Sequence, residues 1–93
     1  MSNPLPAKPE IITKTFFYQG NDNDWYWKTK ALNNEIIADG SEGYRTLRDA
    51  MKGFFLTQGV VKEDFGEWPQ NFGPLTKLPD NQFQINKFLV ESN

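Results

Sequence analysis

The fold is decided by residues 25–39, which read WYWKTKALNNEIIAD. Residues 25–32 alternate between two sides of a strand, one with Trp25, Trp27, Thr29 and Ala31 and the other mainly polar. The pair Asn33-Asn34 suits a two-residue turn of type I′, because asparagine tolerates the positive φ angles that this turn requires. Residues 35–39 then form a second, antiparallel strand. This stretch therefore predicts a β-hairpin with one side facing a core.

A strand is expected before this hairpin and a helix after it. Residues 11–18 are rich in β-branched and aromatic side chains, and residues 20–24 supply a turn. Thr46 is a suitable N-cap for a helix over residues 47–58, where apolar side chains recur at helical spacing up to Gly59. We expect this single amphipathic helix to lie across the sheet.

The two ends of the chain complete the expected fold. Residues 1–10 contain three prolines and predict a flexible arm, so residues 11–93 form a single domain. Residues 82–90 predict a last strand, after a long connection at about 61–80 that contains several Gly and Pro residues. The expected class is α+β, a β-β-β-α-β unit with an antiparallel sheet and one covering helix. Its expected core consists of Trp27, Ala31, Ile36 or Ile37, Met51 and Phe54.

The composition excludes several kinds of chemistry. The chain has 93 residues, a net charge of −2, and neither cysteine nor histidine, so thiol nucleophiles, zinc fingers and histidine-based proton transfer are excluded. The negative charge argues against binding nucleic acid or membrane through overall charge, although it allows a local basic patch. We expect no metal, no cofactor, no membrane span and no export signal, and hence a cytoplasmic protein.

Residues 27–38, WKTKALNNEIIA, and the following Ser41-Glu42-Gly43-Tyr44 resemble the YegP-like family of small uncharacterised proteins. The resemblance covers about residues 16–59. It departs from the family pattern at Asn34, where glycine is usual, and in the longer connection at 61–80. The resemblance implies that two β-β-β-α-β units share one sheet and exchange their last strands. Because this chain has one unit, we expect a homodimer whose C-terminal strand joins the other subunit.

The resemblance implies no catalytic residues, because the family has no established activity. The expected function is therefore that of a non-catalytic accessory module that contacts another protein. The candidate contact residues are Phe65, Glu67, Trp68 and Phe72, since aromatic and acidic residues on a long loop are typical of contact surfaces. The alternative is that these aromatic side chains fold back and cover the sheet.

A second hypothesis places the function on the sheet itself. Tyr26, Lys28 and Lys30 share one side of their strand, and Lys14 can lie beside them on the neighbouring strand. Sheets with aromatic and basic side chains bind single-stranded nucleic acid by stacking and by pairing with phosphates. A small anionic ligand is also compatible with these residues. The alternative is that the lysines only keep a solvated face soluble.

Overall fold

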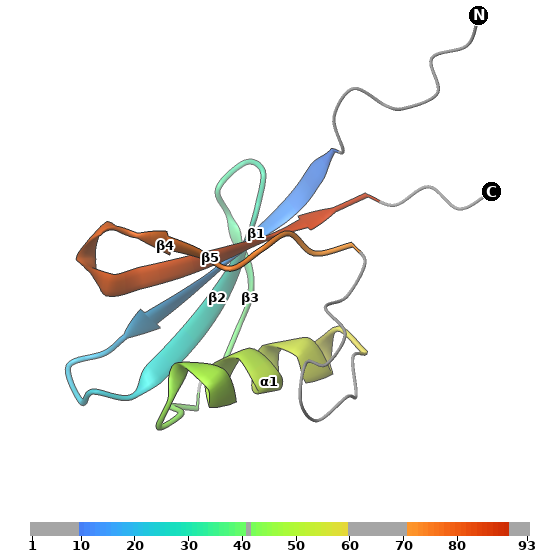
Figure 1. Cartoon of the computed structure of the whole chain (residues 1–93). Coiled ribbons are helices and arrows are strands. Elements are labelled where there is room, and N and C mark those ends of the chain that lie inside the picture. The colour runs from blue at the N-terminus through green and yellow to red at the C-terminus, as the bar shows by residue number, and fades with distance from the viewer. Residues whose placement is uncertain (1–9, 41, 60–70, 90–93) are drawn as a thin grey trace, which may run out of the picture.

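The computed structural model describes residues 10–40, 42–59 and 71–89. They form one antiparallel sheet of five strands, in the order β3-β2-β1-β5-β4, with a single α-helix packed on one side (Figure 1). The predicted α+β class, with an antiparallel sheet and one covering helix, is confirmed. The elements are β1 (Ile11–Gln19), β2 (Trp25–Ala31), β3 (Ile36–Asp39), α1 (Leu47–Thr57), β4 (Thr76–Leu78), the 3-10 turn η1 (Pro79–Asn81) and β5 (Gln82–Phe88).

The hairpin of β2 and β3 forms as predicted, but its turn is of another type. Asn34 has a φ of 75°, whereas Asn33 is outside the positive-φ region. The backbone N–H of Asn34 donates to the carbonyl of Ala31 at 2.9 Å, and the N–H of Ala31 donates to the carbonyl of Glu35 at 2.9 Å. Three residues, Leu32 to Asn34, therefore lie between the hydrogen-bonded residues Ala31 and Glu35, and the last of the three is in the left-handed region.

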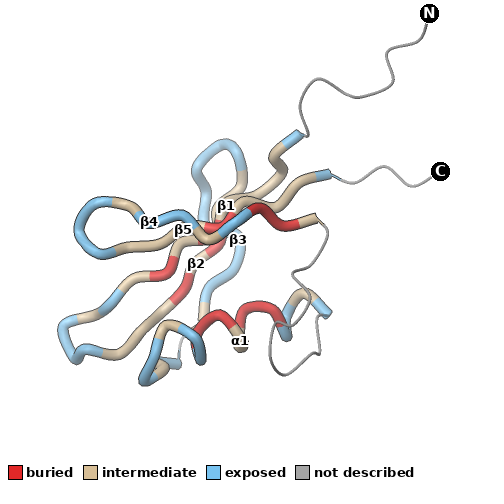
Figure 2. Tube along the Cα trace, viewed as in Figure 1, coloured by how far each residue is buried: buried red, intermediate tan, exposed pale blue. Residues whose placement is uncertain are grey.

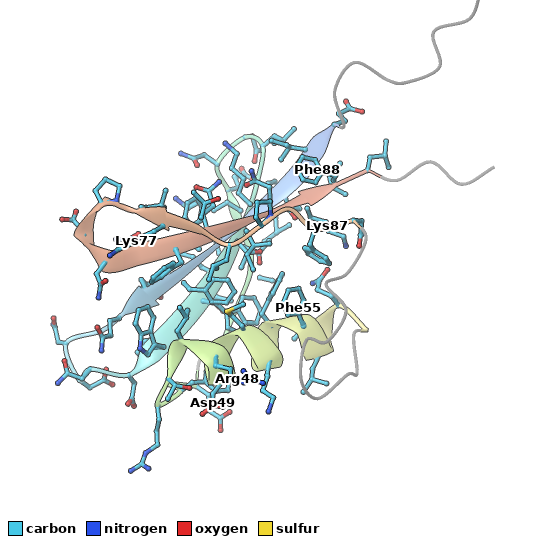
Figure 3. All side chains as sticks on the ribbon, viewed as in Figure 1. Arg48, Asp49, Phe55, Lys77, Lys87 and Phe88 are labelled. Atoms are coloured by element: carbon cyan, nitrogen blue, oxygen red, sulfur yellow. The ribbon has the colours of Figure 1, made fainter. Side chains whose placement is uncertain are left out.

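Helix α1 begins where the sequence predicts. The Thr46 hydroxyl accepts a hydrogen bond from the backbone N–H of Asp49 at 3.0 Å and so satisfies one free donor of the first turn. Arg48 and Asp49 lie on the side of the helix that points away from the sheet (Figure 3). The opposite side carries the buried side chains of Ala50, Met51, Phe54 and Phe55.

The core lies between α1 and the sheet (Figure 2). The ring of Phe54 is at its centre, with ring centroids 5.3 Å from Trp27, 5.8 Å from Phe17 and 5.8 Å from Phe72. All three pairs are edge-to-face, the arrangement that aromatic rings prefer. The other buried apolar side chains are Ala50, Met51, Phe55 and Ile85.

The expectation that Ile36 or Ile37 belongs to this core is wrong. The two side chains are 55% and 57% exposed. Strand β3 is at one edge of the sheet, and α1 packs mainly against β2 and β1, so the helix does not cover β3. Ala31, also expected in the core, is only half-buried at the end of β2.

The last strand lies beside β1 of its own chain. Thr15 is opposite Ile85 and Phe17 is opposite Phe83, so all five strands of this sheet come from one chain. The end of the predicted long connection contains a further strand, β4, which pairs with β5 around the turn η1. Within the described residues, no helix has the length and apolar character needed to cross a membrane.

Candidate functional site

The face of the sheet opposite α1 has its own set of side chains. Lys14, Phe16 and Tyr18 of β1 alternate with the buried Thr15 and Phe17, which point towards the helix. Successive side chains of a strand point to opposite sides, so the first three lie on the other face. In the described part of the chain, no helix covers this face (Figure 1). We call it the outer face.

Strand β2 contributes three more residues to the outer face. Tyr26, Lys28 and Lys30 alternate with the buried Trp27 and Thr29. The strand register joins the two sets in pairs: Lys14 with Lys30, Phe16 with Lys28, and Tyr18 with Tyr26. These six residues are hereafter called the aromatic-lysine patch. The four sheet residues that the sequence singled out, Lys14, Tyr26, Lys28 and Lys30, all belong to it.

The rings and ammonium groups of the patch contact one another. The Nζ atom of Lys28 lies 5.0 Å from the ring centroid of Tyr18, and that of Lys30 lies 5.5 Å from the ring centroid of Phe16. The rings of Tyr18 and Tyr26 are stacked, with centroids 5.9 Å apart and an angle of 23° between their planes. These contacts form two groups, one of Lys28, Tyr18 and Tyr26 and the other of Lys30 and Phe16, on neighbouring rows of the sheet.

The pairing of Lys14 with Lys30 is unfavourable for folding. Like charges directly opposite each other on neighbouring strands destabilise a sheet. Proteins break such local rules most often at functional sites, where another requirement outweighs stability. This pair, together with the half-buried rings beside it, makes the outer face the candidate binding surface.

A carboxylate fixes one end of the patch. The hydroxyl of Tyr26 donates to Oδ2 of Asp22 at 2.6 Å, and the backbone N–H of Asp24 donates to Oδ1 of Asp22 at 3.1 Å. The hydrogen bond from Tyr26 lowers the pKa of Asp22, and the same bond raises the pKa of Tyr26 to about 12. A hollow of about 370 Å³ lies at this end, next to the turn that contains Asp22. The phenol is thus neutral and fixed in position at physiological pH.

Two amide side chains extend the outer face across β5. Gln84 is opposite Phe16 and Asn86 is opposite Lys14, on either side of the buried Ile85. Nε2 of Gln84 donates a hydrogen bond to Oδ1 of Asn86 at 2.7 Å. Two rows of the outer face therefore run from a lysine on β2, through β1, to an amide on β5.

The candidate residues for contact with another protein are only partly described by the structure. Phe72, a candidate contact residue, is only 7% exposed and packs edge-to-face against Phe54 and Phe55, with centroids 5.8 Å and 5.2 Å away. Its ring belongs to the core, as the alternative of a cover of the sheet expects, and a contact of Phe72 with a partner stays a prediction. The other three candidates, Phe65, Glu67 and Trp68, lie outside the described residues.

Sequence reasoning missed four residues of the outer face: Phe16, Tyr18, Gln84 and Asn86. The signal for the first two was available, because a step of two residues from Lys14 leads to Phe16 and then to Tyr18. The signal for the amides was not, because the expected strand exchange placed residues 82–90 in another subunit.

The structure thus defines a small α+β domain with one sheet face covered by a helix and, in the part of the chain that is described, one open face. A family model described as a domain of unknown function (DUF1508) matches residues 21–54. The YegP-like proteins are this family, so the predicted resemblance is confirmed. The comparisons with curated proteins and with solved structures found no match. The matched region includes β2, β3 and most of α1, and hence Tyr26, Lys28 and Lys30.

Proposed function

We propose that this domain is a non-catalytic binding module that holds single-stranded nucleic acid on the outer face of its sheet. The observation that carries the proposal is the aromatic-lysine patch, in which three rings and three lysines occupy neighbouring positions of two adjacent strands. Single strands expose both phosphates and unstacked bases, and proteins bind them with basic side chains and aromatic rings together.

The contacts between lysines and rings are weak enough to be exchanged for contacts with a ligand. A cation-π contact at an exposed site contributes about 0.5–1 kcal/mol. A base stacked on an aromatic side chain contributes about 1–3 kcal/mol. Lys28 and Lys30 can therefore move from Tyr18 and Phe16 to phosphate groups, and the freed ring surfaces can accept bases.

The net charge of −2 limits the affinity without removing the site. Three lysines neutralise about three phosphates, so the logarithm of the binding constant should fall against the logarithm of salt concentration with a slope of about −2. Between about 50 and about 200 mM salt this slope corresponds to about a fifteen-fold loss of affinity. We therefore expect modest, salt-sensitive binding.

The test is fluorescence anisotropy with a labelled single-stranded oligonucleotide of about ten nucleotides, titrated at several salt concentrations. The variant Lys28→Gln should weaken binding and reduce the salt slope by about 0.7. Lys77→Gln is the matched control, because Lys77 is exposed on β4 (Figure 3) and pairs with Phe83, a side chain packed against the core on the covered face. It removes the same charge from another surface and should leave the slope unchanged.

Two outcomes would contradict the proposal. One is the absence of salt-dependent binding by the wild-type protein. The other is an equal effect of Lys28→Gln and Lys77→Gln, which would mean that only net charge matters and that the outer face has no special role.

The predicted homodimer stays a prediction about assembly. Exchange of the last strands would keep the pairing of β1 with β5 and move it between two chains. Light scattering should then give twice the chain mass of 10.8 kDa, and a single species at 10.8 kDa would exclude the dimer. Contact with another protein through Phe65, Glu67 and Trp68 likewise stays a prediction, to be tested by affinity capture with the wild-type protein and Trp68→Ala.

A further inference from the structure

We infer that Gln84 and Asn86 read the edge of a base stacked on Phe16, so that this domain discriminates between bases. The inference rests on the proposed function, because it requires a single strand on the outer face. It goes further by assigning a polarity across the sheet, with phosphates towards β2 and base edges towards β5.

The polarity follows from the register of three strands. Phe16 has Lys28 on one side and Gln84 on the other, and Lys14 has Lys30 on one side and Asn86 on the other. Neighbouring strands are about 4.8 Å apart, so a base that stacks on the central strand extends over the adjacent one. The side with lysines suits phosphate, and the side with amides suits a base edge.

The two amides are arranged for hydrogen bonding to a ligand. Because Nε2 of Gln84 donates to Oδ1 of Asn86 at 2.7 Å, both side chains are held in fixed orientations. Oε1 of Gln84 is an acceptor and Nδ2 of Asn86 is a donor, and neither atom takes part in this bond. A fixed donor and acceptor side by side match the pattern on the Watson–Crick or Hoogsteen edge of a base.

Lysines and amides should therefore have separable effects. The lysines contact phosphates, which are the same in every sequence, whereas the amides contact groups that differ between bases. A substitution on β2 should change affinity equally for all sequences. A substitution on β5 should change the relative affinities.

The experiment measures dissociation constants for labelled oligo(dA), oligo(dC) and oligo(dT) of about ten nucleotides each. For the wild-type protein we expect the tightest and weakest constants to differ by about five-fold or more, the lower limit for a bidentate contact to a base. Gln84→Leu should reduce this ratio to about two-fold or less, whereas Lys28→Gln should weaken all three complexes by one factor and preserve the ratio.

Thr76→Val is the matched control for the amide substitution. Thr76 pairs with Gln84 but lies on β4, one strand further from Phe16, so its loss should leave the ratio unchanged. Equal binding of the three oligonucleotides by the wild-type protein, or an unchanged ratio in Gln84→Leu, would overturn base reading and leave the proposed function standing. Absence of binding to all three would overturn the proposed function itself.

Discussion

Truncation of Phe72 to alanine tests whether this ring supports the fold or serves a partner. The ring is 7% exposed, and its centroid lies 5.8 Å from that of Phe54 and 5.2 Å from that of Phe55. Replacing a buried phenylalanine by alanine costs about 3–5 kcal/mol. A groove of about 460 Å³, lined by Met51, Phe72, Pro74 and Leu75, borders the ring and allows the site to relax. We therefore expect a cost near the lower limit, about 3 kcal/mol.

Thermal unfolding followed by circular dichroism measures this cost. A loss of about 3 kcal/mol should lower the Tm of a domain of this size by about 12–24 °C. Leu56→Ala is the control on the neighbouring helix, because Leu56 is 60% exposed and its truncation should change stability by about 0.5 kcal/mol or less. If Phe72→Ala lowers the Tm by less than about 4 °C, which is about 1 kcal/mol, the ring does not support the core and the reasoning fails.

Three further predictions concern polar and steric details. The hydroxyl oxygens of Thr15 and Thr29 are 2.8 Å apart in the core. Thr15→Val leaves the Thr29 hydroxyl without this partner, so it should lower the free energy of unfolding, measured by urea denaturation, by about 1–3 kcal/mol. The double variant Thr15→Val, Thr29→Val removes both hydroxyls and should change this free energy little. In Asp22→Asn the phenol titration of Tyr26, followed by ultraviolet absorbance, should move down from about 12 towards 10. The pKa of Asp22 is lowered in the folded state, so its ionised carboxylate should stabilise the fold above pH 3.8, and this stabilisation should be lost as the pH falls further. The wild-type protein should show this loss, and Asp22→Asn should not. Gly40→Ala places a methyl group against the indole ring of Trp27. This substitution should lower the free energy of unfolding, followed by thermal unfolding, by about 1–3 kcal/mol.

The sequence predicted those parts of the fold that depend on local pattern. Alternation identified the two strands of the hairpin, and the Thr46 hydroxyl and helical spacing identified α1 within a residue or two of its observed ends. Burial of Ile36 and Ile37 could not be predicted in the same way. An apolar pair in a strand gives no information about whether the strand is central or at an edge, since that depends on the order of strands in the sheet.

The two candidate sites also differ in how far local sequence pattern could predict them. The basic residues of the outer face were predictable, because Lys28 and Lys30 belong to a strand whose alternation is clear. The position of Phe72 depends on the backbone of residues 71–73, which pairs with β5 far away in the sequence: the N–H of Gly73 donates to the carbonyl of Asn86 at 2.8 Å. No periodicity within residues 61–80 indicates this pairing, so the ring was equally compatible with a contact surface.

The proposed function and the fold use the same two strands but different residues of them. In β1, Phe17 is fully buried against Phe54, whereas Phe16, its neighbour in the chain, points to the outer face. The core therefore accounts for Phe17 by the burial of apolar area, but it gives no reason for an aromatic ring at Phe16 or for lysine opposite lysine at Lys14 and Lys30. Strand β3 adds one carboxylate to this face, because Asp39 is opposite Lys28. The pair of lysines and the rings beside it are better explained by a ligand that supplies both negative charges and stacking partners.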